Sequence, residues 1–172
     1  VTVDDKVITK TGFEVDSQII KIVEEPQFAS RAGEKLLQAI IDFNISFRDK
    51  TVIDIGSSTG GFTDCALQYG AKEVYAYDVG TDQMIESLRL DPRVHCNEET
   101  NILDVKVPNA DIILIDVSFT SIEPILKHLV GFEGEIIALI KPQFEAGHVF
   151  FKHGVLKDLK IHRKILEDVL QK

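Results

Sequence analysis

The sequence predicts an α/β protein built on a mostly parallel, doubly wound sheet, and three observations carry this prediction. From Lys50 onward, short apolar runs alternate with segments of helical periodicity, as in successive β-α-β units. The apolar runs start 22, 20, 18 and 24 residues apart, which leaves room for one crossover helix in each interval. A glycine-rich turn follows the first run, at the place where such sheets bind ligands.

Five strands are expected in this sheet, and the third, which is the weakest, is expected at an edge. Their ranges are Thr51–Ile55, Glu73–Tyr77, Arg93–His95, Asp111–Ile115 and Glu135–Ile140. A helix over Arg31–Phe43 leads into the first strand, because apolar residues recur there at helical spacing. A last helix is expected after Asp158.

The composition fits one globular core, because the chain has 172 residues of which 44% are hydrophobic and 27% charged. Its apolar runs fall far short of the roughly 20 residues of a membrane-spanning helix. The beginning of the chain lacks the basic and apolar regions of a secretory signal. Cys65 and Cys96 lack the spacing of a metal or redox motif. We therefore expect a cytoplasmic protein with no membrane span and no metal site.

The charge is unevenly distributed along the chain. The net charge of −9 argues at face value against a nucleic-acid partner. Residues 1–126 hold 11 Lys and Arg against 22 Asp and Glu, whereas residues 127–172 hold 8 against 6. An anionic partner would therefore approach from the C-terminal third, although a solvated face with no partner explains the asymmetry equally well.

Residues 1–25 differ in kind from the rest. Valines are spaced through this polar stretch, and Gly12 is expected at a turn. Such a pattern is typical of hairpin strands, here outside the main sheet. Glu24-Glu25-Pro26 reads as a linker, so the expected domains are residues 1–25 and 26–172.

The glycine-rich turn has the spacing G-x-x-x-G-G within Asp54-Ile55-Gly56-Ser57-Ser58-Thr59-Gly60-Gly61-Phe62. A dinucleotide site needs G-x-G-x-x-G, and no Gly-Lys-Ser/Thr of a Walker A loop follows. S-adenosylmethionine has no pyrophosphate, so its site needs only a glycine-rich turn with an acid before it, here Asp54. The alternative is a turn that merely packs tightly.

Two residues extend this candidate cofactor site. Asp78 ends the second strand, 22 residues after Gly56, where a carboxylate can accept both ribose hydroxyls, with Val79 beside it. The alternative is an Asp that caps the next helix. Asn101 follows the third strand at the level of an adenine ring, although an Asn in a loop is more often a turn residue.

Charged residues at two more strand ends form a candidate catalytic group. Asp116 follows the fourth strand and Lys141 the fifth, so they should face each other across the cofactor, with Lys35 joining them from the first helix. Two neighbouring ammonium groups lose proton affinity, so Lys141 could act as a general base held by Asp116. A structural salt bridge with a solvated Lys35 is an equal alternative.

Five motifs in order resemble the TlyA, or haemolysin A-like, family of FtsJ-like RNA methyltransferases. They are Ser30–Leu36, Asp54–Asp64, Tyr77–Gly80, Ile115–Phe119 and Ile140–Gly147. The resemblance implies a Rossmann-like methyltransferase that uses S-adenosylmethionine to methylate a ribose 2′-hydroxyl of ribosomal RNA.

The resemblance also assigns roles to individual residues. Lys35, Asp116 and Lys141 match the first three members of the family's Lys-Asp-Lys-Glu tetrad. The fourth lies on a later strand than this chain reaches, so the resemblance implies a sheet without its last strands.

Residues 1–25 resemble the tail of an S4 RNA-binding domain. The partner implied is ribosomal RNA or a ribosomal subunit, with the oligomeric state open. A membrane-active haemolysin and a cofactor-binding module without catalysis are the alternatives.

Overall fold

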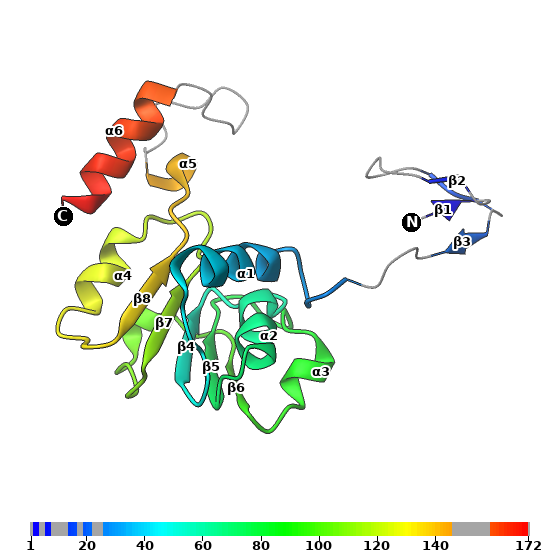
Figure 1. The fold of residues 1–172 in the computed structure, drawn as a ribbon, viewed down its shortest axis with the longest axis horizontal. Helices are drawn as coiled ribbons and strands as arrows, with labels where there is room; N and C mark the ends of the chain where they lie inside the picture. Colours follow the sequence, from blue (N-terminus) through cyan, green and yellow to red (C-terminus); the bar gives the residue numbers. More distant parts are fainter. Residues whose placement is uncertain are drawn as a thin grey trace.

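The computed structural model describes residues 2–3, 6–7, 14–16, 19–21, 26–145 and 159–171. Its main body is a five-stranded sheet in which all strands are parallel, in the order β6-β5-β4-β7-β8 (Figure 1). The strands are β4 (Thr51–Ile55), β5 (Glu73–Tyr77), β6 (Val94–Asn97), β7 (Ile112–Ile115) and β8 (Glu135–Ala138). The predicted α/β class and the edge position of the third strand are confirmed.

Three predicted strand ranges differ from the structure: β6 begins at Val94 rather than Arg93, β7 begins at Ile112 rather than Asp111, and the far ends of β6 and β8 differ as well. The neighbouring strands explain these two far ends. β6 runs on to Asn97 because β5 offers partners from Val74 to its last residue, Tyr77. β8 ends at Ala138 rather than Ile140. The N–H of Leu139 donates to the carbonyl of Ile115, the last residue of β7, and the ladder has no partner beyond it.

The strand order creates a switch point at the centre of the sheet. From β4 the chain moves outward through β5 to β6, and then returns to the other side of β4 to form β7 and β8. The ends of β4, β5 and β7 are level, since Ile55 pairs with both Tyr77 and Ile115. Ligands of such sheets bind beyond the carboxyl ends of the strands at this reversal.

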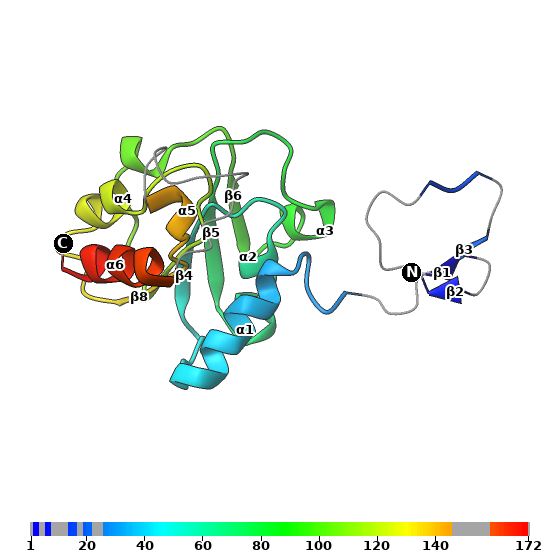
Figure 2. The same ribbon diagram turned by 90° about the horizontal axis from the view of Figure 1, so that it is seen from above.

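Helices cover both faces of the sheet, as Figure 2 shows from above. α1 (Ala32–Phe43), α2 (Gly61–Gln68) and α3 (Glu86–Arg89) pack one core with Val52. The 3₁₀ turn η1 (Ile102–Asp104), α4 (Glu123–His128) and α6 (Leu159–Leu170) pack the other with Ile53. Neighbouring residues of β4 thus enter opposite cores, because side chains alternate along a strand. α5 (Pro142–Glu145) follows β8 directly.

The N-terminal strands form a separate antiparallel sheet, drawn apart from the body in Figure 1. It contains β1 (Thr2–Val3), β2 (Lys6–Val7) and β3 (Ile20–Lys21), in the order β2-β1-β3. The prediction of strands outside the main sheet is confirmed. The expected turn at Gly12 and the linker residues Glu24 and Glu25 lie outside the described residues.

Within the described ranges, no helix is long and apolar enough to span a bilayer.

Candidate active site

The glycine-rich turn connects β4 to α2 and leans on the neighbouring strands. The N–H groups of Gly56 and Ser57 donate to the carbonyl of Tyr77 at 2.9 and 3.1 Å. Gly56 has φ +84°, and a Cβ there would lie 3.0 Å from the carbonyl oxygen of Asp116. A Cβ on Gly61 would collide with the Ser30 hydroxyl. These glycines are thus required by close protein neighbours, and the turn is held rigidly at the switch point.

Asp54 lies beneath this turn, fully buried in β4. The hydroxyl of Thr63 donates to its Oδ2 at 2.7 Å, whereas Oδ1 is buried without a hydrogen-bond partner. Burial raises the pKa of Asp54 to about 7, and the nearby charges of Asp116 and Asp78 add to the rise. Asp54 therefore joins β4 to α2 through Thr63 and does not line the crevice described next.

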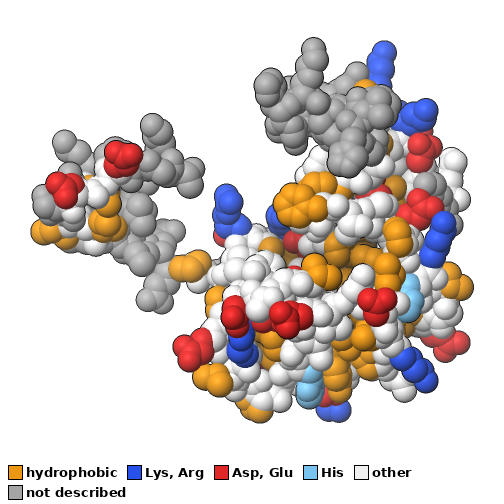
Figure 3. Space-filling model, turned by 180° about the vertical axis from the view of Figure 1, so that it is seen from behind, with side chains coloured by type: hydrophobic (Ala, Val, Ile, Leu, Met, Phe, Trp, Pro, Cys, Tyr) orange, Lys and Arg blue, Asp and Glu red, His pale blue; other side chains and the backbone are white. Residues whose placement is uncertain are grey.

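A crevice of about 600 Å³ opens at the carboxyl ends of β4, β5 and β7. This volume lies in the range of pockets for small molecules and cofactors. Six residues predicted for the site line it: Gly56, Ser58, Asp78, Val79, Asn101 and Asp116. Hydrophobic side chains gather in the hollowed face of the body in Figure 3.

The remaining residues predicted to bind the cofactor surround the crevice without lining it. Ser57 and Phe62 are buried, and Phe62 belongs to the core that α2 packs against the sheet. Gly60 and Gly61 form the junction with α2, and Thr59 faces a shallower hollow on the α1 side. The turn thus presents Gly56 and Ser58 to the crevice.

Asp78 clamps two turns together at the rim of the crevice. Its Oδ2 accepts the N–H of Ser58 at 2.8 Å, and its Oδ1 accepts the N–H of Gly80 at 2.7 Å. The bond to Gly80, two residues on, shapes the turn after β5. Each carboxylate oxygen keeps a further lone pair, so Asp78 can still accept hydroxyl protons from a ligand.

Asn101 caps the 3₁₀ turn beside the crevice. Its Oδ1 accepts the N–H of Leu103 at 3.1 Å. Asn101 thus acts as a turn residue, which was the alternative that the sequence offered to a contact with adenine. Ile102 and Leu103 add apolar surface to the same wall. The wall therefore suits the flat face of a base.

The structure brings Asp116 and Lys141 together. The side-chain nitrogen of Lys141 lies 2.6 Å from Oδ1 of Asp116, in an ion pair. It donates to the hydroxyl of Ser118 at 2.8 Å and to the backbone carbonyl of Asp116 at 3.4 Å. The two charged side chains are only 12% and 16% exposed. An ammonium group is thus fixed at the edge of the crevice.

Lys35 lies elsewhere. It is exposed on α1 and faces a shallow hollow of about 710 Å³ together with Arg31, Ser58 and Thr59. No hydrogen bond or ion pair links Lys35 to Asp116 or Lys141 in the described part of the chain. The glycine-rich turn lines both hollows, through Ser58.

Sequence reasoning singled out neither the role of Phe119 nor that of Glu145. Phe119 lines the crevice, is 92% exposed and has φ +64°, a strained conformation for a bulky residue. Its ring lies 5.3 Å from that of Phe144. The carboxylate of Glu145 bonds to the segment after β7. Both residues lie within the motifs of the family resemblance, which was the one available signal.

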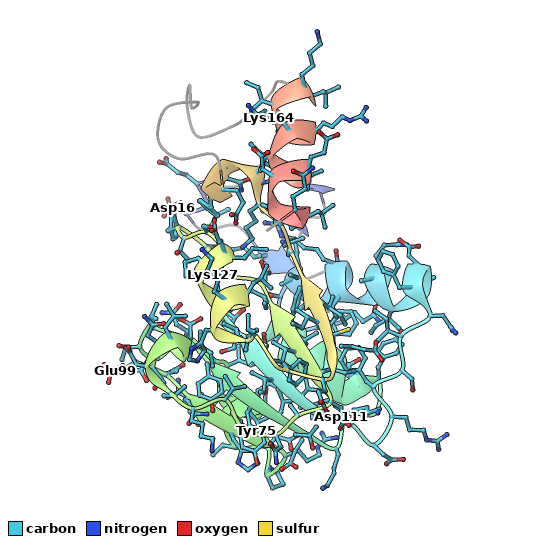
Figure 4. The ribbon with its side chains drawn as sticks, turned by 90° about the vertical axis from the view of Figure 1, so that its left-hand side faces the viewer. Asp16, Tyr75, Glu99, Asp111, Lys127 and Lys164 are labelled. Atoms are coloured by element: carbon cyan, nitrogen blue, oxygen red, sulfur yellow. The ribbon has the colours of Figure 1, made fainter. Side chains whose placement is uncertain are left out.

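A third hollow, of about 700 Å³, lies at the opposite end of the sheet. It is lined by Lys50, Asp111 and the loop after α4. Figure 4 shows Asp111 at the foot of the strands, where its Oδ2 accepts the N–H of Thr51 at 2.8 Å. The amino ends of parallel strands are not where such sheets bind ligands. The candidate active site is therefore the crevice at Asp78 and Asp116.

A parallel sheet in the order 3-2-1-4-5, a glycine-rich turn after its first strand and a carboxylate after its second define the Rossmann-like class. Solved structures agree with this class. A hemolysin-named protein from Streptococcus thermophilus is 43% identical, with a TM-score of 0.82 over 87% of this chain and 57% of that one. A Listeria monocytogenes protein described as an S-adenosylmethionine-dependent methyltransferase is 26% identical, with a TM-score of 0.51 over 66% of this chain and 55% of that one.

Sequence comparison gives the family. Residues 28–172 match the model of the FtsJ-like methyltransferase family. Hemolysin A of Brachyspira hyodysenteriae is 43% identical over 97% of this chain and 73% of its own length. The 16S/23S rRNA (cytidine-2'-O)-methyltransferase TlyA of Mycobacterium tuberculosis is 39% identical over 77% of this chain and 53% of its own. The chain belongs to the FtsJ-like methyltransferase family, and the methyltransferase class implied by its motifs is confirmed.

Proposed function

We propose that this protein transfers a methyl group from S-adenosylmethionine to a ribose 2′-hydroxyl of ribosomal RNA. The observation that carries the proposal is the ion pair of Asp116 and Lys141 at the edge of the crevice that Asp78 rims. The M. tuberculosis and Campylobacter jejuni relatives are named as rRNA cytidine-2'-O-methyltransferases, which supports RNA as the substrate. A ribosomal substrate also implies a cytoplasmic protein.

The crevice suits this cofactor. Asp78 would accept the ribose hydroxyls, and the apolar wall at Val79, Ile102 and Leu103 would take the adenine. A pyrophosphate would be bound at a helix N-terminus. The glycine-rich turn instead reaches the crevice through Ser58, and the N-terminus of α2 does not line it. When bound, the cofactor supplies a methyl group already activated by the positive sulfur.

The task of the protein is then to position the hydroxyl and remove its proton. In its neutral form Lys141 would take the 2′-hydroxyl proton as the ribose oxygen replaces the cofactor sulfur on the methyl carbon. Asp116 and Ser118 hold the nitrogen of Lys141 in place. Lys35 would assist from the α1 side once the substrate fills the space between Lys35 and Lys141. Of the three candidate catalytic residues it has the weakest structural support, because it faces a different hollow.

The exposed ring of Phe119 supports RNA rather than a small substrate. Sequence-specific RNA binding commonly uses unpaired bases that stack on aromatic side chains. Phe119 offers such a ring beside the crevice, in a strained backbone conformation. We expect the base of the target nucleotide, or of its neighbour, to stack there.

One experiment tests the proposal directly. The full-length protein is incubated with ribosomal subunits and cofactor carrying a labelled methyl group, and the labelled nucleotide is mapped. A 2′-O-methylated ribose is the expected product. Label on a base, or on protein alone, would show that the substrate assignment is wrong. Leakage from liposomes without methyl transfer would favour a membrane-active hemolysin instead.

A further inference from the structure

Glu145 ties together the two segments that carry Asp116 and Lys141. Its Oε2 accepts the hydroxyl proton of Ser121 at 2.5 Å, and its Oε1 accepts the N–H of Ile122 at 2.9 Å. Glu145 ends the short helix α5, whereas Ser121 and Ile122 belong to the segment between β7 and α4. The carboxylate thus joins parts of the chain that are 23 and 24 residues apart.

We propose that Glu145 is a positioning residue that holds Lys141 against Asp116. The inference rests on the proposed function, in which Lys141 is the base. Lys141 and Glu145 lie one helical turn apart, and the N–H groups of Phe144 and Glu145 donate to the carbonyl of Lys141 at 2.8 and 3.3 Å. Fixing the carboxylate of Glu145 therefore fixes the backbone from which the side chain of Lys141 extends.

Besides its contact with α6, α5 is held by polar and aromatic contacts to the segment after β7. None of its four residues is fully buried, so it has no core side chain of its own. The Phe119–Phe144 contact and the bonds of Glu145 join α5 to residues 119–122. The ion pair of Lys141, the residue before α5, joins the same segment at Asp116. The two hydrogen bonds of Glu145 hold the end of α5 that lies farthest from β8.

The contact between Glu145 and Ser121 also shapes the crevice. The hydroxyl of Ser121 also accepts the N–H of Glu123 at 3.1 Å, at the start of α4. Ser121 and Pro124 line the crevice. Loss of the Glu145 carboxylate would therefore loosen Lys141 first and this wall of the crevice second, while Asp78 on the opposite wall stays in place.

A charge-based role for Glu145 predicts something different. If its negative charge or its proton mattered in the reaction, Glu145→Gln would be as damaging as Glu145→Ala. A positioning role needs only a group of the same shape that still accepts the N–H of Ile122, and the amide oxygen of Gln does so. The two variants therefore separate the two roles.

Chemical labelling of Lys141 tests the proposal without methyl transfer. Purified protein is treated with acetic anhydride, and acetylation of Lys141 is followed by mass spectrometry, with the exposed Lys72 as internal reference. We expect Glu145→Ala to raise the acetylation rate of Lys141 about tenfold, the factor that corresponds to about 1.4 kcal/mol. Glu145→Gln should stay close to wild type. Glu167→Ala removes the same charge from an exposed pair with Arg163 and should change nothing.

A methyl-transfer assay on ribosomal subunits forms the second arm. Glu145→Ala should lower kcat while the Kd of S-adenosylhomocysteine changes little, and Glu145→Gln should restore kcat. Unchanged acetylation of Lys141 in Glu145→Ala, or equal loss in both variants, would overturn the proposal. If Glu145→Ala does not fold, Glu145→Asp, whose arm is one methylene shorter, should give a smaller rise in acetylation, and no rise counts against the proposal. A wild type that shows no methyl transfer refutes the proposed function and leaves the labelling result intact.

Discussion

The carboxylate of Asp78 accepts the backbone N–H of Ser58 at 2.8 Å, so the turns after β4 and β5 are clamped to each other at the rim of the crevice. The same carboxylate is the group expected to receive the ribose of the cofactor. One residue would thus both shape the site and contact the ligand, so its removal should affect binding in two ways.

We expect Asp78→Ala to weaken S-adenosylhomocysteine by about tenfold or more, since hydrogen bonds to a charged group contribute about 1.5–3 kcal/mol each. Isothermal titration calorimetry measures the effect. Asp82→Ala is the matched control, because that carboxylate is exposed, pairs with Arg89 and does not line the crevice. Equal affinity in Asp78→Ala and wild type would contradict the assignment.

Lys141→Ala should lower methyl transfer by about 10²-fold or more, the contribution of a positioned general base. Cofactor affinity should stay nearly unchanged, because Lys141 does not line the crevice. Single-turnover kinetics with ribosomal subunits check the first expectation, and calorimetry checks the second. Lys127→Ala serves as control, since Lys127 is exposed on α4 and pairs with Glu123 (Figure 4). Near-normal turnover by Lys141→Ala would place the base elsewhere.

Asp54→Asn should stabilise the ligand-free protein in a pH-dependent way. The pKa of Asp54 is raised from 3.8 to about 7 by burial, so between these pH values the folded protein keeps a proton that the unfolded chain releases. The stability of the wild type therefore falls, relative to the variant, by on the order of 1 kcal/mol per pH unit over this range.

Chemical unfolding at pH 5 and pH 8 measures this difference for Asp54→Asn. The gain should be larger at pH 8 than at pH 5 and constant above about pH 7. The hydrogen bond from Thr63 can be kept by the amide oxygen of Asn. A gain that does not depend on pH would mean that Asp54 is ionised throughout.

Glu98→Gln should destabilise the loop that borders the crevice after β5. The carboxylate of Glu98 accepts the N–H groups of Asp82, Gln83 and Met84 and pairs with Arg89. These bonds, that of Met84 first, lower the pKa of Glu98 below its ordinary 4.5. A lowered pKa stabilises the fold above about pH 4.5, and this stabilisation is lost as pH falls through the folded pKa.

The cost of Glu98→Gln should be about 1–3 kcal/mol at pH 7 and smaller at pH 3, as measured by urea unfolding. Glu99→Gln is the neighbouring control, because the carboxylate of Glu99, labelled in Figure 4, is exposed. Among the described residues it accepts a hydrogen bond only from the hydroxyl of Thr81. An equal cost in both variants would show that the three amide contacts do not matter.

Phe119→Gly should separate stability from RNA binding. Glycine adopts φ +64° without strain, so the variant should be at least as stable as wild type. Loss of the ring should weaken RNA binding by about 1–3 kcal/mol, the contribution of stacking one base. Filter binding with an rRNA segment measures it, and Phe119→Tyr should bind as wild type does. Unchanged affinity in Phe119→Gly would exclude the ring as a platform.

The strand ranges could be predicted closely because they follow from local patterns. β4 and β5 were predicted residue for residue, since each is an apolar run bounded by polar or turn residues. The edge position of β6 followed from its weak pattern. Cys96 and Asn97 lay beyond the predicted range Arg93–His95, and pairing with β5 includes them.

The site could be predicted only as far as topology determines it. The sequence by itself determined that Asp78, Asp116 and Lys141 follow strands of one parallel sheet, because the carboxyl ends of parallel strands meet at one edge. Only the tertiary structure decided what each side chain contacts. It joined Lys141 to Asp116, left Lys35 exposed on the other side of the glycine-rich turn and buried Asp54 beneath that turn. These outcomes depend on the loops beyond the strands, whose conformations arise from contacts between residues far apart in sequence, such as Glu145 with Ser121.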